Sequence, residues 1–173
     1  RFNMRLEYQI DSMNSILYTS SVILQHSESL SKSVSSTTSE TPLLNYLAIV
    51  GNSENTNERD GHNLNNNFLF RHKFSKIGRT FTIGWNNSFG KSESDGFTIS
   101  NNTFYSPTGA ASATFAQNQN NKQKNENRNN IISGSYTEPF GLNKLLEINY
   151  AYTNNVNESQ RKTFNYNGSN GKY

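Results

Sequence analysis

The residues that decide the fold are Arg1–Gln25, RFNMRLEYQIDSMNSILYTSSVILQ. Apolar side chains such as Leu6 alternate with polar ones such as Arg5, and the same alternation resumes later in this stretch. The segment Asp11–Asn14 interrupts it, and three of its four residues are types that favour turns. Because successive side chains of a strand point to opposite faces, the pattern predicts a β-hairpin with one apolar and one polar face.

The same arrangement occurs twice more along the chain. Alternating residues flank a short turn at Ser75–Arg79, and others flank a third short turn at Phe140–Lys144. The three turns are spaced by about 65 residues, and a fixed spacing indicates one repeated supersecondary unit. The sequence therefore predicts three antiparallel hairpins of related design.

Long polar passages separate the hairpins. They are His26–Thr41, Gly51–His62 and Lys91–Asn130, and we expect all three to lie in long loops because polar tracts between periodic segments are usually loops. The Asn/Gln/Lys tract AQNQNNKQKNENRNN within the third passage also has a prion-like composition, although a solvent-exposed loop explains it more simply. The predicted connections are thus short at one end of the strands and long at the other.

Composition narrows the class of protein. The 173 residues are only 32% hydrophobic with a mean hydropathy of −0.82, but 12% are aromatic, which argues against a disordered chain. The absence of cysteine excludes disulfides and thiolate metal sites. The net charge of +3 comes from dispersed Lys and Arg residues, so no nucleic-acid partner is predicted. No apolar run is long enough for a transmembrane helix.

Alternating strands with short turns at one end and long loops at the other are typical of transmembrane β-barrels. We therefore predict an all-β, antiparallel up-and-down meander of about six long strands, part of such a barrel with short periplasmic turns and long extracellular loops. Residues 1–173 are expected to form a single internal segment of it, without the plug and the remaining strands. A soluble β-domain is the alternative, and it would place mainly Val, Ile and Leu on its buried face rather than the many aromatic residues found here.

The alternation assigns residues to the two faces of the predicted wall. His72 and Glu138 fall on the apolar side, but both lie beside short turns, where lipid penalises a charge least. The residues predicted to face lipid are Phe2, Leu6, Tyr8, Phe68, Phe70, Phe81, Ile83, Trp85, Ile148 and Tyr150. The charged residues predicted to face the lumen are Arg5, Glu7, Arg71, Lys73 and Glu147, as a solvated or ion-paired wall or as contacts for a plug or ligand.

Three stretches carry a resemblance to a known family: NMRLEYQIDSMNSILYT, NNFLFRHKFSKIGRTFTIGW and SGSYTEPFGLNKLLEINYAY. They resemble the barrel region of the large outer-membrane β-barrel proteins of Bacteroidota, which are similar to TonB-dependent receptors. The resemblance implies a barrel of about 22 strands in the bacterial outer membrane, filled by an N-terminal plug. It also implies uptake of an unknown ligand, driven by the TonB energy-coupling system.

No chemistry-bearing motif points to an enzyme. The three histidines lack metal-ligand spacing, the two Asp-Gly sequences lack the first carboxylate of a calcium loop, and no Gly-x-Ser-x-Gly elbow or phosphate loop occurs. We therefore predict a non-enzymatic protein with no catalytic, cofactor-binding or metal-binding residues. A surface β-protein that mediates adhesion through its long loops, without transport, is the alternative function.

Overall fold

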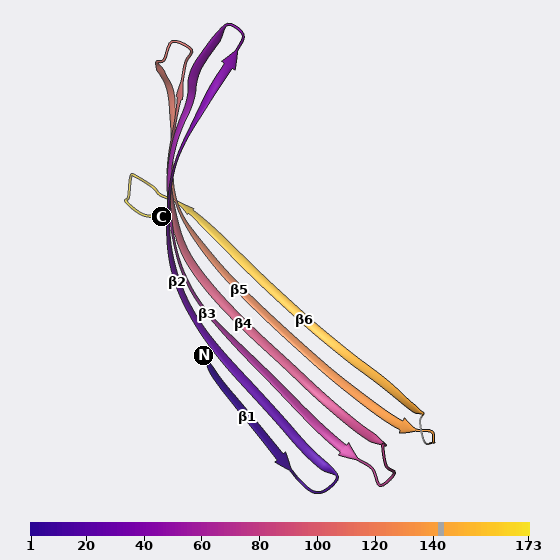
Figure 1. Cartoon of the computed structure of the whole chain (residues 1–173). Helices are drawn as coiled ribbons and strands as arrows, with labels where there is room; N and C mark the ends of the chain where they lie inside the picture. Colours follow the sequence, from indigo (N-terminus) through magenta and orange to yellow (C-terminus); the bar gives the residue numbers. More distant parts are fainter. Residues whose placement is uncertain (142–143) are drawn as a thin grey trace. The chain divides into compact units, whose positions relative to one another are not determined.

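The structure is a computed structural model that describes residues 1–141 and 144–173. It contains one six-stranded antiparallel sheet whose strands follow each other in chain order, as predicted (Figure 1). The order leaves β1 and β6 at the two edges of the sheet. The strands are β1 (Phe2–Gln9), β2 (Asn14–Thr41), β3 (Leu44–Lys73), β4 (Thr80–Tyr105), β5 (Ala111–Pro139) and β6 (Leu145–Asn165).

The pairing of β1 with β2 separates the side chains of the first hairpin into two faces. Leu6 lies opposite Tyr18, and Arg5 lies opposite Thr19. One face, called face A, therefore carries the even-numbered residues of both strands, and the other, called face B, carries the odd-numbered ones. Among the paired residues of this hairpin, face A is apolar except for Ser20, and face B is polar except for Leu17. The predicted two-faced hairpin is confirmed.

Side-chain contacts carry the two faces across the sheet. On face A, hydrogen bonds link Ser20 of β2 to Asn66 of β3, Asn66 to Asn87 of β4, and Asn87 to Asn130 of β5. On face B, hydrogen bonds link Ser21 to Asn65, Asn65 to Ser88 and Ser135 to Glu147, and the Ser133 side chain lies over the position that a Cβ of Gly84 would take, so the face can be followed from β2 to β6. By alternation, face A carries the even residues of β3, β5 and β6 and the odd residues of β4.

The first two short turns form where the sequence predicts them. In the first, the Asp11 carboxylate accepts hydrogen bonds from the backbone N–H groups of Met13 and Asn14, which closes an Asx-type turn. In the second, Gly78 adopts a positive φ of 84°, a conformation that glycine reaches without steric cost. The third predicted turn, Phe140–Lys144, includes residues 142–143, which lie outside the described residues.

The prediction of long loops is wrong. His26–Thr41 belongs to β2 and Gly51–His62 to β3, while β4 and β5 account for nearly all of Lys91–Asn130. The chain reverses at Pro42–Leu43 between β2 and β3, and at Ser106–Ala110 between β4 and β5, where Gly109 has a φ of 80°. The physical reason is that a backbone ladder already paired near the short turns continues through polar residues, because each added pair needs only its neighbours' backbone groups.

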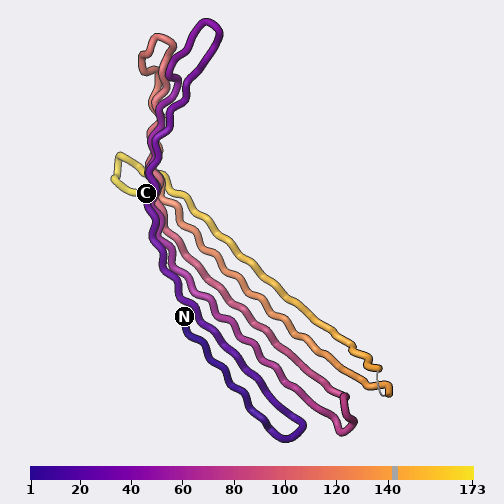
Figure 2. Tube along the Cα trace, viewed as in Figure 1, coloured from indigo at the N-terminus to yellow at the C-terminus, as the bar shows by residue number. Residues whose placement is uncertain are grey.

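The chain divides into two compact units, each containing residues of strands β2 to β6. Unit 1 comprises Arg1–Gln25, Gly61–Ser92 and Asn125–Ser159, and unit 2 comprises His26–Asp60, Glu93–Lys124 and Gln160–Tyr173. The path of the chain through both can be followed from indigo to yellow (Figure 2). Within the described residues no Val, Leu, Ile, Met or aromatic side chain is buried, so neither unit has a hydrophobic core there. No helix in the same residues is long and apolar enough to cross a membrane.

Candidate functional site

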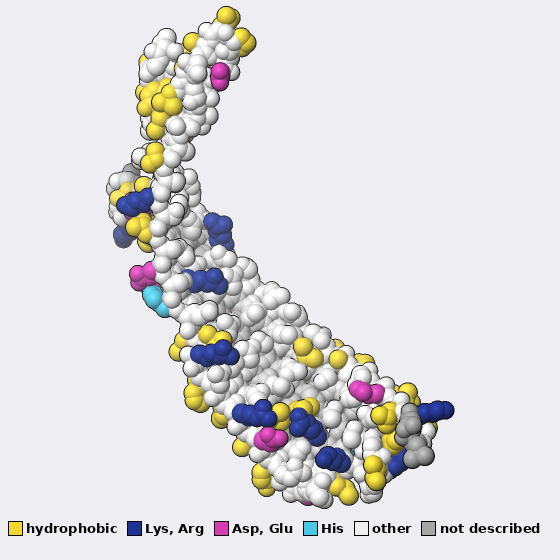
Figure 3. Space-filling view, viewed as in Figure 1, with side chains coloured by type: hydrophobic (Ala, Val, Ile, Leu, Met, Phe, Trp, Pro, Cys, Tyr) yellow, Lys and Arg dark blue, Asp and Glu magenta, His cyan; other side chains and the backbone are white. Residues whose placement is uncertain are grey.

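Face A of unit 1 is the largest candidate surface. It brings together all ten residues predicted to face lipid, on β1, β3, β4 and β6. Many of their side chains are uncovered: Phe2 is 64% exposed, Ile148 58% and Tyr150 73%. The side of the sheet seen in the space-filling view is, in contrast, mostly polar over the lower strands, with Lys and Arg side chains among polar ones and hydrophobic side chains scattered (Figure 3). An uncovered apolar face is a surface for lipid or for another protein, since water alone leaves it unfavourably solvated.

The five charged residues predicted to face a lumen all lie on face B. Arg5 and Glu7 form an exposed ion pair with an N–O distance of 3.1 Å. Glu147 accepts hydrogen bonds from the Ser135 hydroxyl and from the Asn149 amide. Arg71 and Lys73 share face B by alternation along β3. The five residues thus share one polar face, on which Arg5, Glu7 and Glu147 have hydrogen-bonding or ionic partners.

His72 and Glu138, the residues that break the apolar pattern of face A beside the short turns, are held by partners close to those turns. The His72 ring lies 2.7 Å (Nδ1 to Oδ1) from the Asn14 side chain, and edge-on to Phe74. Glu138 receives hydrogen bonds from Lys76 and Arg79, the latter through both carboxylate oxygens. The His72–Asn14 contact joins the second hairpin to the first, and the Glu138 contacts join it to the third, so these polar groups tie the three hairpins of unit 1 together.

A polar ladder crosses face A of unit 1, formed by Ser20, Asn66, Asn87 and Asn130. The Asn66 carbonyl accepts bonds of 2.8 and 2.9 Å from the Tyr18 and Ser20 hydroxyls. The Asn66 amide then donates to Asn87 at 3.4 Å, and the Asn87 amide donates to Asn130 at 2.8 Å. Sequence reasoning missed this ladder, because single asparagines on an apolar parity carry no signal until the register brings them together.

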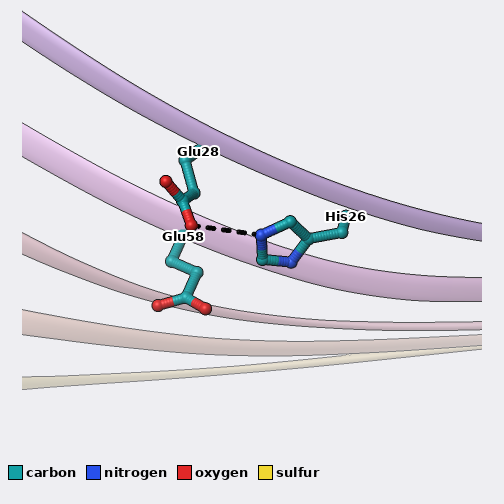
Figure 4. Close-up of side chains that lie close together, drawn as sticks. All are labelled: His26, Glu28 and Glu58. Carbon is teal, nitrogen blue, oxygen red and sulfur yellow. Dashed lines mark hydrogen bonds and ion pairs between the residues drawn. The ribbon is translucent and has the colours of Figure 1, made fainter.

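A cluster of ionisable groups lies on face A of unit 2, around His26. Its Nδ1 lies 2.8 Å from the Asp60 carboxylate and its Nε2 lies 3.2 Å from Glu28. The Glu58 carboxylate approaches the same imidazole and Glu28 (Figure 4). An imidazole and two carboxylates are ligand types for a divalent cation, but both ring nitrogens already engage carboxylates, so we interpret the group as an ion-pair cluster. An open hollow of about 490 Å³, lined in part by Glu58, Asp60 and Lys122, adjoins it.

The His26 cluster makes the pairing of β2 with β3 in unit 2 depend on pH. Hydrogen bonds to Asp60, and next to Glu28, raise the pKa of His26 above its usual 6.5. The stabilisation is therefore fully present below pH 6.5 and is lost as the pH rises through the raised value. We expect an NMR titration of the His26 ring to give a pKa above 6.5, and Asp60→Asn to lower it.

Glu54→Gln is the matched control for that titration. Glu54 lies in the same unit and pairs with Lys32 at 3.0 Å, away from the imidazole, so this substitution should leave the His26 pKa unchanged. A pKa of 6.5 or lower in the unsubstituted protein would contradict the cluster, as would equal shifts in both variants.

Comparison with known proteins adds no assignment. No protein-family model matches the sequence, and no curated protein is similar to it.

Proposed function

We propose that the chain forms part of the wall of a β-barrel in the bacterial outer membrane, with face A of unit 1 against lipid and face B toward the interior. The observation that carries the proposal is the uncovered apolar face of unit 1, set against a polar face on the same strands. A membrane barrel has this distribution, because its outside meets hydrocarbon and its inside meets water or a plug. Phe2, Leu6 and Tyr8 then contact lipid, and Arg5 and Glu7 line the interior.

The stagger of the short turns supports this assignment. The first hairpin closes at Asn14, and Asn14 lies beside His72 of β3. The second hairpin closes two residues further along the chain, at the pair Phe74–Arg79. In the same way, Arg79 at the end of the second hairpin lies beside Glu138 of β5. The third hairpin closes two residues further along the chain, at Phe140.

Each hairpin thus extends two residues, about 7 Å, beyond its neighbour over a lateral distance of about 10 Å. If the three turns lie at one membrane surface, the strands are inclined by about 35°. That is within the tilt found in membrane barrels.

The polar residues of unit 2 fit the same proposal. A membrane-crossing strand needs about 9–11 residues, whereas β2 has 28 and β3 has 30. The remainder of β2 is mostly polar, and that of β3 is polar except for the apolar run Leu44–Val50. We assign the hairpins around Pro42–Leu43 and Ser106–Ala110 to the extracellular side. They replace the long loops expected from the sequence and are the parts placed to meet an external ligand.

Within this architecture we propose ligand uptake across the outer membrane. The basis is the resemblance of the three short-turn stretches to TonB-dependent receptors, which would supply an N-terminal plug and an energy-coupling partner. The polar hairpins of unit 2 equally suit adhesion without transport. The full-length gene sequence distinguishes the two functions. A plug domain with a TonB-contact segment before this chain would support uptake, and its absence would support adhesion.

The requirement for lipid or detergent tests the barrel itself. We expect the purified chain to aggregate in aqueous buffer, because face A of unit 1 is uncovered, and to become monodisperse in detergent micelles. Size-exclusion chromatography with light scattering measures both states. A monodisperse monomer without detergent would favour the soluble β-domain instead.

A further inference from the structure

The polar ladder divides face A of unit 1 by chemistry. Between the ladder and the short turns, face A carries mainly apolar side chains, including Phe70 and Ile83. In the next row of face A beyond the ladder, Leu64 and Phe89 are still apolar. Arg128 lies in that row too, with its guanidinium 5.7 Å from the centre of the Phe89 ring and 3.3 Å (Nη2 to Oε2) from the Glu126 carboxylate of the following row. His62 follows, with its own ring 5.7 Å from Phe89. Charge therefore begins immediately past the ladder.

The height of the ladder above the turns matches a bilayer. Asn66 lies eight residues before Phe74, and Asn87 lies eight residues after Arg79, so both are equally far from the closing pair of their hairpin. At about 3.3 Å per residue and an inclination of about 35°, the ladder stands about 22 Å above that pair. The apolar band of an outer-membrane barrel is about 25 Å tall.

The hydrogen bonds of the ladder suit this position. A side-chain amide facing hydrocarbon without a partner is costly, and each amide here is bonded to a neighbouring strand. An amide has more donors and acceptors than these bonds use, and the rest are satisfied only where water or lipid headgroups reach them.

We infer that the polar ladder marks the outer limit of the lipid hydrocarbon, and that Arg128 and His62 meet the anionic phosphate groups of the lipid headgroups directly above it. The inference rests on the proposed barrel and adds its position in the membrane. A guanidinium stacked on an aromatic ring at this level can bind phosphate while its apolar neighbours remain near the acyl chains.

Spin labelling tests the position, and the absence of cysteine makes single-cysteine variants straightforward. We would label Phe70→Cys, Phe68→Cys, Asn66→Cys and His62→Cys on face A of β3, in the whole protein reconstituted in vesicles containing phosphatidylglycerol. Collisions with oxygen report hydrocarbon, and collisions with a water-soluble nickel chelate report the aqueous phase. We expect oxygen to dominate at positions 70 and 68, and nickel to dominate at 62, with the crossover at 66.

Labels on face B and on a second strand complete the experiment. Asn65→Cys and Asn67→Cys, on the opposite face of β3, should show no oxygen-dominated site. Trp85→Cys and Asn87→Cys on β4 should repeat the crossover, which protects the result against a fold defect in one variant. A crossover two or more positions from the ladder overturns the inference and leaves the barrel standing. Nickel dominance at every face A site, including 70, overturns the proposed barrel as well.

Discussion

Replacing Ile148 with Arg is expected to destabilise the membrane-inserted protein by about 2–4 kcal/mol. Ile148 is 58% exposed on face A, four residues after Lys144, where the third hairpin closes. In the proposed barrel, at the inclination given by the turns, it would lie about 11 Å from the membrane surface, near the middle of a band about 25 Å tall. A guanidinium there would be surrounded by acyl chains, far from either headgroup layer.

Asn149→Arg is the matched control, one residue further along the same strand and on face B. Asn149 is exposed, and its amide donates to the Glu147 carboxylate at 3.0 Å, so an arginine there meets a counter-ion and water. We expect its unfolding free energy to change by less than about 0.5 kcal/mol. Urea titration in vesicles compares the two variants. Equal losses in both, or none in Ile148→Arg, would show that face A does not contact lipid.

Replacing Gly90 with Val is expected to destabilise the sheet by about 1 kcal/mol, because the ends of two side-chain amides must move aside. Gly90 lies on face B of β4, where the Asn63 and Asn127 side chains lean over it from both neighbouring strands. A Cβ would stand 2.5 Å from the Asn63 carbonyl oxygen and closer still to that of Asn127. Both amides must move together to admit a side chain, which is why the loss should exceed that of an ordinary surface substitution.

Gly134→Val gives the comparison for Gly90. A Cβ at Gly134, on face A of β5, would meet only the Thr82 carbonyl oxygen at 3.8 Å, an ordinary contact. Because Val also has the higher strand propensity, this variant should be neutral or slightly more stable. Denaturant midpoints of the two variants in one detergent test the difference. A loss in Gly134→Val as large as in Gly90→Val would contradict the crowding specific to face B.

The part of the fold that could be predicted from sequence is the part where the two faces differ. The alternation of apolar and polar residues, such as Leu6 beside Arg5, shows which side chains share a face. Asp11 and Gly78 mark turns by their own conformational preferences. The strand residues of His26–Thr41 could not be recognised in this way, because Ser and Thr occur on both parities there. Asn is also depleted in strands generally, so the composition of the Asn-rich part of β5 favoured a loop over the strand that it forms.

The candidate sites also differ in how far the sequence could predict them. The apolar and charged residue sets followed from alternation, and the register places each on a single face. The polar ladder, the Glu138 contacts and the His26 cluster join residues from strands far apart in sequence, such as Arg79 with Glu138 and His26 with Asp60. Only the pairing of the strands creates these neighbours, and no single segment encodes it.

The open edges of the sheet can pair in two ways, with further strands of a barrel or with other copies of the chain. β1 and β6 are the edges of the described sheet, and the outer side of each presents an unpaired backbone row. In the hydrocarbon around the proposed barrel such rows would be untenable, so further strands would have to pair with them. In water the same rows template strand addition by other copies and seed fibrils. Arg161 and Lys162, charges near the end of β6, would slow that misassembly until the membrane is reached.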